Sequence, residues 1–130
     1  MISFIVPAYN EEQCLAETLD ALHATGIAVG EAYEVVVADD GSTDKTAAIA
    51  TQKGATLVSA TNRQIAATRN SGARAATGDW LIFVDADTVV NVDVVRAAVQ
   101  AMRNGAVGGG AGLCFDEPVP ALRGFCCGSL

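Results

Sequence analysis

The chain has 130 residues, 51% of them hydrophobic and 18% charged, which allows one domain with a buried core and excludes a disordered chain. Its 15 acidic and 8 basic side chains give a net charge of −7, which argues against nucleic acid or an anionic membrane surface as the main partner. No apolar run approaches the ~20 residues of a membrane-spanning helix, and the first residues lack the basic flank of a signal peptide.

Short apolar runs alternate with helical patterns along the chain. The apolar runs predict strands at Ile2–Val6, Tyr33–Ala38, Ala55–Ser59, Trp80–Val84 and Ala106–Leu113. The first helix is expected to follow Asn10, with Gln13 completing a capping box, and to end at Gly26. Ser42 and Asn91 are expected to cap the second and last helices.

This alternation predicts an α/β fold of Rossmann-like type, with a mostly parallel, twisted sheet and helices on both faces. In such sheets, ligands bind beyond the carboxyl ends of the strands. Polar residues follow three predicted strands there, as P-A-Y-N-E (7–11), D-D-G-S (39–42) and D-A-D (85–87). Because clustered carboxylates are costly without cations and oxygen ligands favour Mg²⁺ or Mn²⁺, we expect a divalent metal at this edge.

Each of these residues also has a purely structural interpretation. Tyr9 can be ordinary packing at a sheet edge, and Asp39 and Asp40 can form the Asx-turn that leads into the next helix. Arg69 is either a cation beside an anionic ligand or an exposed helix residue. His23, in the first predicted helix, is expected on the solvated surface.

Three segments read S-F-I-V-P-A-Y-N-E-E (3–12), V-V-V-A-D-D-G-S-T-D-K-T (35–46) and A-T-R-N-S-G-A-R-A-A-T-G-D-W-L-I-F-V-D-A-D-T (67–88). Together they resemble family 2 glycosyltransferases, which have the GT-A fold. The resemblance implies transfer of a sugar, with inversion, from a nucleotide-diphosphate donor to an acceptor nucleophile. A metal would assist by stabilising the charge on the diphosphate leaving group.

The resemblance also assigns roles to individual residues. Those implied to bind the nucleotide are Pro7, Ala8, Tyr9, Glu11, Asp39, Arg69, Asp85 and Ala86. Tyr9 is expected near the base, and Asp39 is expected to accept a hydrogen bond from the base, assisted by Arg69. Asp85 is expected to reach the ribose or a metal-bound water. Asp87, with Asp85, is the expected ligand of Mn²⁺ or Mg²⁺ on the diphosphate.

By this resemblance, residues 1–113 form the donor-binding domain and residues 114–130 begin an acceptor-binding half. The family's general base lies in that half, beyond the D-x-D motif. After Asp93 the sequence offers only Asp116 and Glu117, in no segment that matches the base motif. We therefore expect the general base beyond residue 130 and interpret the chain as a fragment or a truncated product.

Two alternatives remain open. A non-catalytic nucleotide-sugar-binding module would share the donor half and lack the general base. The segment V-D-A-D-T-V (84–89) also fits the nucleophile motif of haloacid dehalogenase-type phosphatases, in which Asp85 would attack phosphorus. The lysine that such enzymes need downstream is missing, because the last lysine is Lys53. The base, the sugar and the acceptor, whether a saccharide or a lipid carrier, are not specified by these residues.

The spacing of the four cysteines indicates the cellular compartment of the protein. Cys14, Cys114, Cys126 and Cys127 show no C-x-x-C spacing and predict reduced thiols in a cytoplasmic protein. Because membrane attachment is common in the family that the chain resembles, the resemblance also allows a location at the cytoplasmic face of the membrane. The apolar, glycine-rich C-terminal edge predicts strand pairing with a second copy of the chain.

Overall fold

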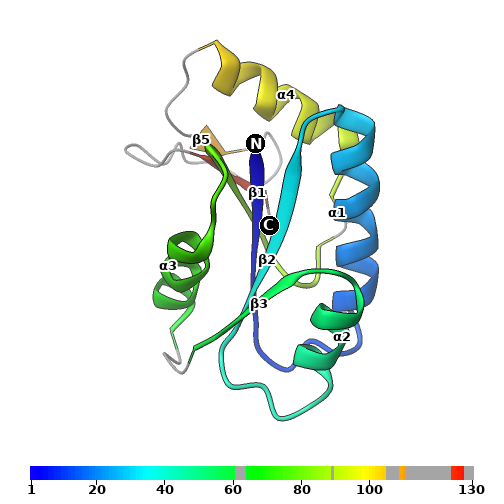
Figure 1. Cartoon of the computed structure of the whole chain (residues 1–130), viewed down its shortest axis with the longest axis vertical. Coiled ribbons are helices and arrows are strands. Elements are labelled where there is room, and N and C mark those ends of the chain that lie inside the picture. Colours follow the sequence, from blue (N-terminus) through cyan, green and yellow to red (C-terminus); the bar gives the residue numbers. More distant parts are fainter. Residues whose placement is uncertain (61–63, 89, 105–108, 111–123, 128–130) are drawn as a thin grey trace.

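The computed structural model describes residues 1–60, 64–88, 90–104, 109–110 and 124–127. The strands are β1 (Ile2–Ala8), β2 (Tyr33–Asp39), β3 (Thr56–Ser59), β4 (Trp80–Val84), β5 (Gly109–Gly110) and β6 (Gly124–Cys127). The helices are α1 (Leu15–Val29), α2 (Thr46–Gln52), α3 (Ile65–Ala75) and α4 (Val92–Arg103) (Figure 1). The other residues of the strand predicted at 106–113, where pairing with a second copy was expected, lie outside the described residues.

The strands form one sheet in the order β3-β2-β1-β4-β6-β5, and each strand pairing in the described residues is parallel. This confirms the predicted parallel α/β sheet. β1 lies at the centre, where Ile5 pairs with Val36 on one side and Phe83 on the other. Because a helix crosses back between successive strands from β1 to β4, these strands run in the same direction and share a carboxyl edge.

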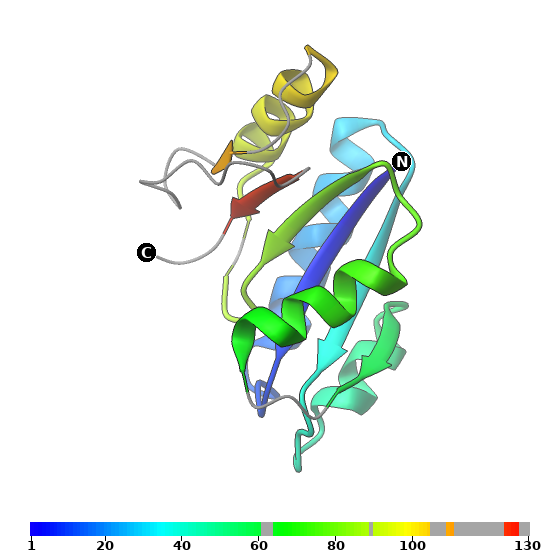
Figure 2. The same ribbon diagram turned by 90° about the vertical axis from the view of Figure 1, so that its left-hand side faces the viewer.

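Helices cover both faces of the sheet, as predicted. Figure 2 shows α3 crossing one face, with α1 behind the sheet. Since successive strand residues point to opposite faces, β1 serves two cores. Phe4 and Val6 pack in the larger core, which includes residues of α1 and α4, whereas Ile5 packs with Val36 and Phe83 on the α3 face.

A glycine brings α3 close to the sheet. A Cβ atom at Gly72 would lie 2.5 Å from Cγ2 of Ile5 and 3.4 Å from Cβ of Ala38. Only a residue without a side chain allows this approach, although glycine in a helix costs about 1 kcal/mol relative to alanine. The close packing fixes where the side chains at the start of α3 stand relative to the carboxyl edge.

The first helix departs from its predicted boundaries at both ends. α1 begins at Leu15 and its N-cap position is Cys14, so Asn10, which has a φ of 50° and lies in the preceding loop, does not cap it. Gly26 is not the C-terminal cap either. It is buried inside the helix, where a Cβ atom would meet the Tyr33 ring at 2.5 Å. The left-handed cap is Gly30, with a φ of 80°.

The other two capping predictions have different outcomes. Ser42 does not cap α2, which begins at Thr46; Asp44 instead accepts a hydrogen bond from the Thr46 amide at 2.9 Å. Asn91 caps α4 as predicted, since its Oδ1 accepts from the Asp93 amide at 2.7 Å. A short polar side chain thus satisfies an early helix amide in both helices.

His23 is a structural link and not a solvated surface residue, which corrects the expectation. Its Nδ1 lies 2.9 Å from the Tyr33 hydroxyl and its Nε2 lies 2.6 Å from the Lys53 carbonyl oxygen. The imidazole therefore joins α1 to β2 and to the residue that follows α2.

Cys14 is a free thiol, and the side chains of the other cysteines lie outside the described part of the chain. In that described part, each helix is too short or too polar to cross a bilayer.

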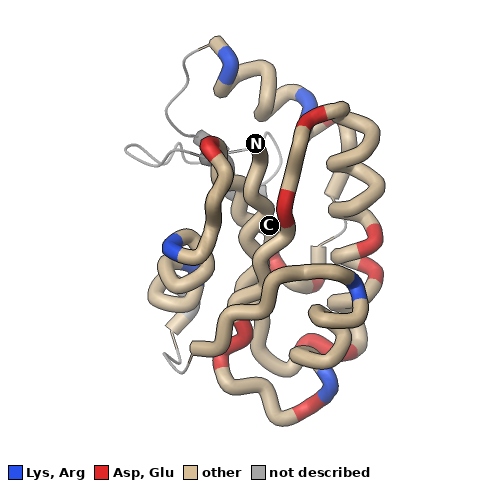
Figure 3. Tube along the Cα trace, in the orientation of Figure 1, with Lys and Arg blue, Asp and Glu red and all other residues tan. Residues whose placement is uncertain are grey.

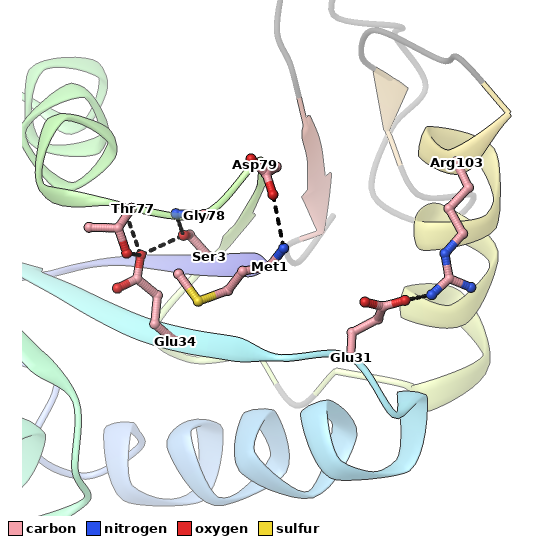
Figure 4. A network of polar contacts seen from close by, with 8 residues as sticks. All are labelled: Met1, Ser3, Glu31, Glu34, Thr77, Gly78, Asp79 and Arg103. Atoms are coloured by element: carbon pink, nitrogen blue, oxygen red, sulfur yellow. Dashed lines mark hydrogen bonds and ion pairs between the residues drawn. The ribbon is translucent and has the colours of Figure 1, made fainter.

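A polar network ties the amino edge of the sheet to the segment between α3 and β4 (Figure 4). Glu34 Oε2 accepts hydrogen bonds from the Ser3 hydroxyl at 2.6 Å and from the Thr77 amide at 2.6 Å. The Gly78 amide donates to the Ser3 hydroxyl oxygen at 2.8 Å. Burial alone would raise the pKa of Glu34, but the hydrogen bonds from Ser3, Thr77 and Gly78 outweigh it and hold the pKa below 4.5.

We expect Glu34→Gln to lower the free energy of unfolding by about 1–2 kcal/mol at pH 7, because the network loses a charged acceptor. Since the folded pKa of Glu34 is depressed, its stabilisation is present above pH 4.5 and is lost as the pH falls through the folded pKa. Urea denaturation from pH 7 down to pH 3 should therefore show the two stabilities converging. Glu17→Gln, on the exposed side of α1, is the control and should change stability by less than about 0.5 kcal/mol. A deficit in Glu34→Gln that stays constant with pH would contradict the role of the charge.

Candidate functional site

Three loops leave the sheet at the carboxyl ends of β1, β2 and β4. Register places Ala8 opposite Asp39, so β1 and β2 end side by side. Acidic positions gather in the loops at the lower end of the sheet in Figure 3, where β1 and β2 end. The predicted convergence of the first and second polar segments at one edge is therefore present in the fold.

A cavity of about 310 Å³ opens at this edge. Its lining residues are Pro7, Ala8, Tyr9, Glu11, Asp40, Gln64 and Thr68. The first four are the residues of the P-A-Y-N-E segment that were expected to line a nucleotide pocket, and the last two come from α3 and the residue before it. Tyr9, which lines this cavity, keeps 43% of its surface exposed.

Asp40, and not Asp39, is the acidic residue of the D-D-G-S segment that lines the cavity. Asp39 Oδ1 accepts a hydrogen bond from the Ser42 amide at 3.2 Å, which is the turn-forming role that the sequence left open. Both aspartates are buried, and each keeps only 7% of its surface exposed. The sequence signal that could have identified Asp40 as the cavity residue is the alternation of side chains along a strand. Ala38 faces Gly72 of α3, and Asp40, two residues further along, is expected on the same face.

The D-A-D segment follows β4 as a tight turn, in which the Thr88 amide donates to the Asp85 carbonyl oxygen at 3.1 Å. Asp85 Oδ1 lies 3.3 Å from Arg69 Nη2, and both side chains are about one third exposed, at 30% and 32%. Asp87 is exposed and Ala86 is buried. Arg69, expected beside the base, therefore pairs with the D-A-D segment, one residue along α3 from the cavity-lining Thr68.

Glu11 lines the cavity and also interacts electrostatically with the D-A-D segment. Burial raises the pKa of Glu11 above 4.5, and the negative charges of Asp87, Asp44 and Asp85 raise it further. Glu11, Asp85 and Asp87 thus belong to one field of negative charge. A cation placed in that field would relieve the repulsion that disfavours ionised Glu11.

The donor set fits a metal that is shared with a phosphate ligand. No three Asp, Glu, His or Cys side chains of the described residues converge closely enough to hold an ion by themselves. Mg²⁺ and Mn²⁺ with phosphate ligands commonly need only one or two carboxylates, with phosphate and water oxygens completing the shell. Asp85 and Asp87 can supply such carboxylates, so the residues present agree with the expected metal.

Sequence reasoning missed a set of hydrogen bonds between the loops after β1 and β2, which we term the loop clasp (Asn10–Glu12 with Ser42–Thr46). The Asn10 amide donates to the Ser42 hydroxyl oxygen at 2.8 Å, and Asn10 Oδ1 accepts from the Thr43 amide at 2.8 Å. Asn10 makes both bonds from the left-handed region, which asparagine tolerates better than most residues. The clasp thereby fixes the chain between Tyr9 and Glu11.

The clasp continues on the helix side of Asn10. The Glu11 amide donates to the Thr46 hydroxyl oxygen at 2.9 Å, and the Glu12 amide donates to Asp44 Oδ2 at 3.3 Å. The Lys45 amide in turn donates to Glu12 Oε2 at 3.3 Å. Each loop therefore satisfies backbone amides of the other, and these hydrogen bonds hold the two loops together.

Asn10→Ala should lower the free energy of unfolding by about 2 kcal/mol, because alanine is strained in the left-handed region and leaves the Thr43 amide without this acceptor. The matched control is Asn70→Ala on the exposed side of α3, where the change should be within about 0.5 kcal/mol. Urea denaturation of both variants measures the difference. Equal stability of the two variants would show that the clasp is not a stabilising contact.

Two solved structures resemble the chain in fold and sequence. Glucosyl-3-phosphoglycerate synthase from Mycobacterium tuberculosis, crystallised with Mn²⁺, UDP and glucosyl-3-phosphoglycerate, matches 78% of this chain with a TM-score of 0.62 and 28% identity. S. aureus TarS 1–349 in complex with UDP-GlcNAc matches 92% of this chain with a TM-score of 0.63 and 27% identity. The matches cover 39% and 36% of those chains. These likenesses agree with the GT-A fold that the resemblance implies.

Sequence comparison gives the same family. Undecaprenyl-phosphate 4-deoxy-4-formamido-L-arabinose transferase of Pseudomonas aeruginosa (strain LESB58) is 35% identical over 99 residues, which are 67% of this chain. The match spans only 28% of that transferase, so the chain corresponds to a minor part of its length. The family model described as Glycosyl transferase family 2 matches residues 3–124. The chain therefore belongs to glycosyltransferase family 2.

Proposed function

We propose that this chain binds a nucleoside-diphosphate sugar at its carboxyl edge and serves the transfer of that sugar, with inversion, to an acceptor. The observation that carries the proposal is the cavity of about 310 Å³ between β1 and α3, with Glu11 in its wall. Glu11 is coupled to the charges of Asp85 and Asp87, and Arg69 pairs with Asp85. A nucleoside pocket next to carboxylates suited to a metal diphosphate is what this reaction requires.

The cavity is suited to a base with an N–H donor. We assign the base-accepting role to Asp40 and not to Asp39, because Asp40 lines the cavity and Asp39 does not. The half-exposed Tyr9 ring offers a surface for the base, and Pro7 and Ala8 supply apolar wall. Uracil has such a donor, and two similar structures hold UDP or a UDP-sugar, so we propose UDP as the nucleotide.

The D-A-D segment is proposed to receive the diphosphate. Asp87, which is exposed, would hold Mn²⁺ or Mg²⁺, with Asp85 as a second ligand or as a partner of the ribose or a metal-bound water. A divalent ion bound there supplies electrostatic stabilisation of the charge that develops on the leaving diphosphate. Arg69 would restrain the Asp85 carboxylate through their contact at 3.3 Å.

Net charge supports a metal at this site. The chain carries a net charge of −7, and Arg69, which contacts the D-A-D segment, already pairs with Asp85. A diphosphate would add further negative charge to a field that disfavours ionised Glu11. A divalent cation at this edge would offset that negative charge and favour binding of the donor.

The acceptor is proposed to be a saccharide or a lipid carrier on the cytoplasmic side. The name of the Pseudomonas aeruginosa relative specifies undecaprenyl phosphate, which supports a polyprenyl phosphate as the first acceptor to test. No residue of the described part is assigned as general base. Membership of family 2 leaves the phosphatase interpretation of Asp85 without support.

Calorimetric titration of the folded chain should show UDP binding that Mn²⁺ strengthens by at least about tenfold, a change of about 1.4 kcal/mol. Asp87→Asn should abolish the strengthening by Mn²⁺, because it removes the proposed ligand charge. Asp93→Asn, at an exposed position on α4, carries the same chemical change and should behave like the unchanged chain.

GDP and dTDP titrated under the same conditions test the choice of base and should bind more weakly than UDP. A folded chain that binds none of the three nucleotides, with or without Mn²⁺, would contradict the proposed function. UDP binding that ignores both Mn²⁺ and Asp87→Asn would leave the nucleotide site standing and refute the metal site.

A further inference from the structure

A buried threonine of α1 reaches across to the D-A-D segment. The Thr18 hydroxyl donates to the carbonyl oxygen of Ala86 at 2.7 Å. Thr18 is 1% exposed and Ala86 is 4% exposed, so water does not compete for this contact. The two residues stand 68 positions apart in the sequence, and nothing in the local pattern around Thr18 predicts the contact.

The hydroxyl has one proton and two acceptors within reach. The second is the Cys14 carbonyl oxygen, one helical turn back, at 3.2 Å. A hydroxyl hydrogen bond is normally 2.5–3.0 Å long, so the Ala86 contact has the better length. The Cys14 oxygen also accepts from the Thr18 amide at 3.2 Å, which leaves it satisfied without the hydroxyl. Geometry and satisfaction of acceptors both assign the proton to Ala86.

The Ala86 carbonyl needs a partner from outside the sheet. β4 ends at Val84, so Ala86 lies beyond the strand's ladder of hydrogen bonds. A buried carbonyl without a partner carries a desolvation cost, and that cost opposes any turn geometry that breaks the contact. Thr18 thereby sets the orientation of the peptide group that joins Ala86 to Asp87, between the two carboxylate residues of the segment.

We propose that Thr18 is a positioning residue for the metal-binding carboxylates: its hydrogen bond to Ala86 holds the D-A-D turn in the conformation that presents Asp85 and Asp87 to a metal diphosphate. This inference rests on the proposed function of that edge. Groups that orient metal ligands typically change metal affinity by about 10–100-fold when they are removed. Thr18 touches neither donor nor metal and acts through the backbone of Ala86.

The test compares three variants of the full chain. Thr18→Val keeps the shape and removes the hydroxyl, whereas Thr18→Ser keeps the hydroxyl and removes a methyl group. Thr25→Val makes the same change as the first variant at a second buried threonine, seven residues further along α1. Circular dichroism checks that each folds; if Thr18→Val does not, Thr18→Ala takes its place.

Two measurements are made on each variant. The ¹³C chemical shift of the Ala86 carbonyl, recorded without ligand, reports the hydrogen bond. Calorimetry with UDP, with and without Mn²⁺, reports how strongly the metal enhances nucleotide binding. We expect Thr18→Val to move the Ala86 shift and to reduce the Mn²⁺ enhancement by about tenfold, with metal-free UDP affinity unchanged within about twofold. Thr18→Ser and Thr25→Val should keep the enhancement of the unchanged chain.

The outcomes separate the inference from the proposed function. An unchanged Mn²⁺ enhancement in Thr18→Val, in a chain that otherwise binds UDP with Mn²⁺, overturns the positioning role. Equal loss of metal-free and metal-dependent affinity also overturns it, because a general structural role would weaken both. If the unchanged chain binds no UDP under either condition, the proposed function fails and the positioning role fails with it, whatever the Ala86 shift shows.

Discussion

Parallel pairing of β1 with both β2 and β4 is the constraint on which the rest of the site depends. It brings the carboxyl ends of β1, at Ala8, and of β4, at Val84, to the same edge of the sheet as the end of β2, although these positions are far apart in the sequence. The apolar strands that create this pairing are buried along most of their length. Hydrophobic burial therefore supplies the free energy that holds the polar ends together.

The polar ends are then fixed by contacts between them. The loop clasp joins the loops after β1 and β2, and Thr18 joins α1 to the turn after β4. Gly72 adds a third restraint, because it allows α3 to approach the sheet closely. Contacts of this kind within the protein restrain the loops of the site, and such restraint lowers the ordering cost of binding.

The sequence predicted the elements well and their polar partners poorly, for one physical reason. Strand positions follow from apolar runs within one segment, and Trp80–Val84 was predicted with the observed bounds. Partners such as Ser42 for Asn10, or Ala86 for Thr18, depend on which distant segments meet. The prediction of a capping box at Asn10 was wrong, because the amide and the side chain of Asn10 form hydrogen bonds with the loop after β2.

The most direct test of the account is nuclear magnetic resonance of the ¹⁵N-labelled chain, titrated first with UDP and then with Mn²⁺. The account predicts that UDP shifts the amide signals of Tyr9, Asp40 and Thr68, and that Mn²⁺ then broadens first those of Asp85 to Asp87 and of Glu11. Broadening centred on other carboxylates, such as Glu34 at the amino edge, with the signals of the D-A-D turn unaffected, would contradict a shared nucleotide and metal site at the carboxyl edge.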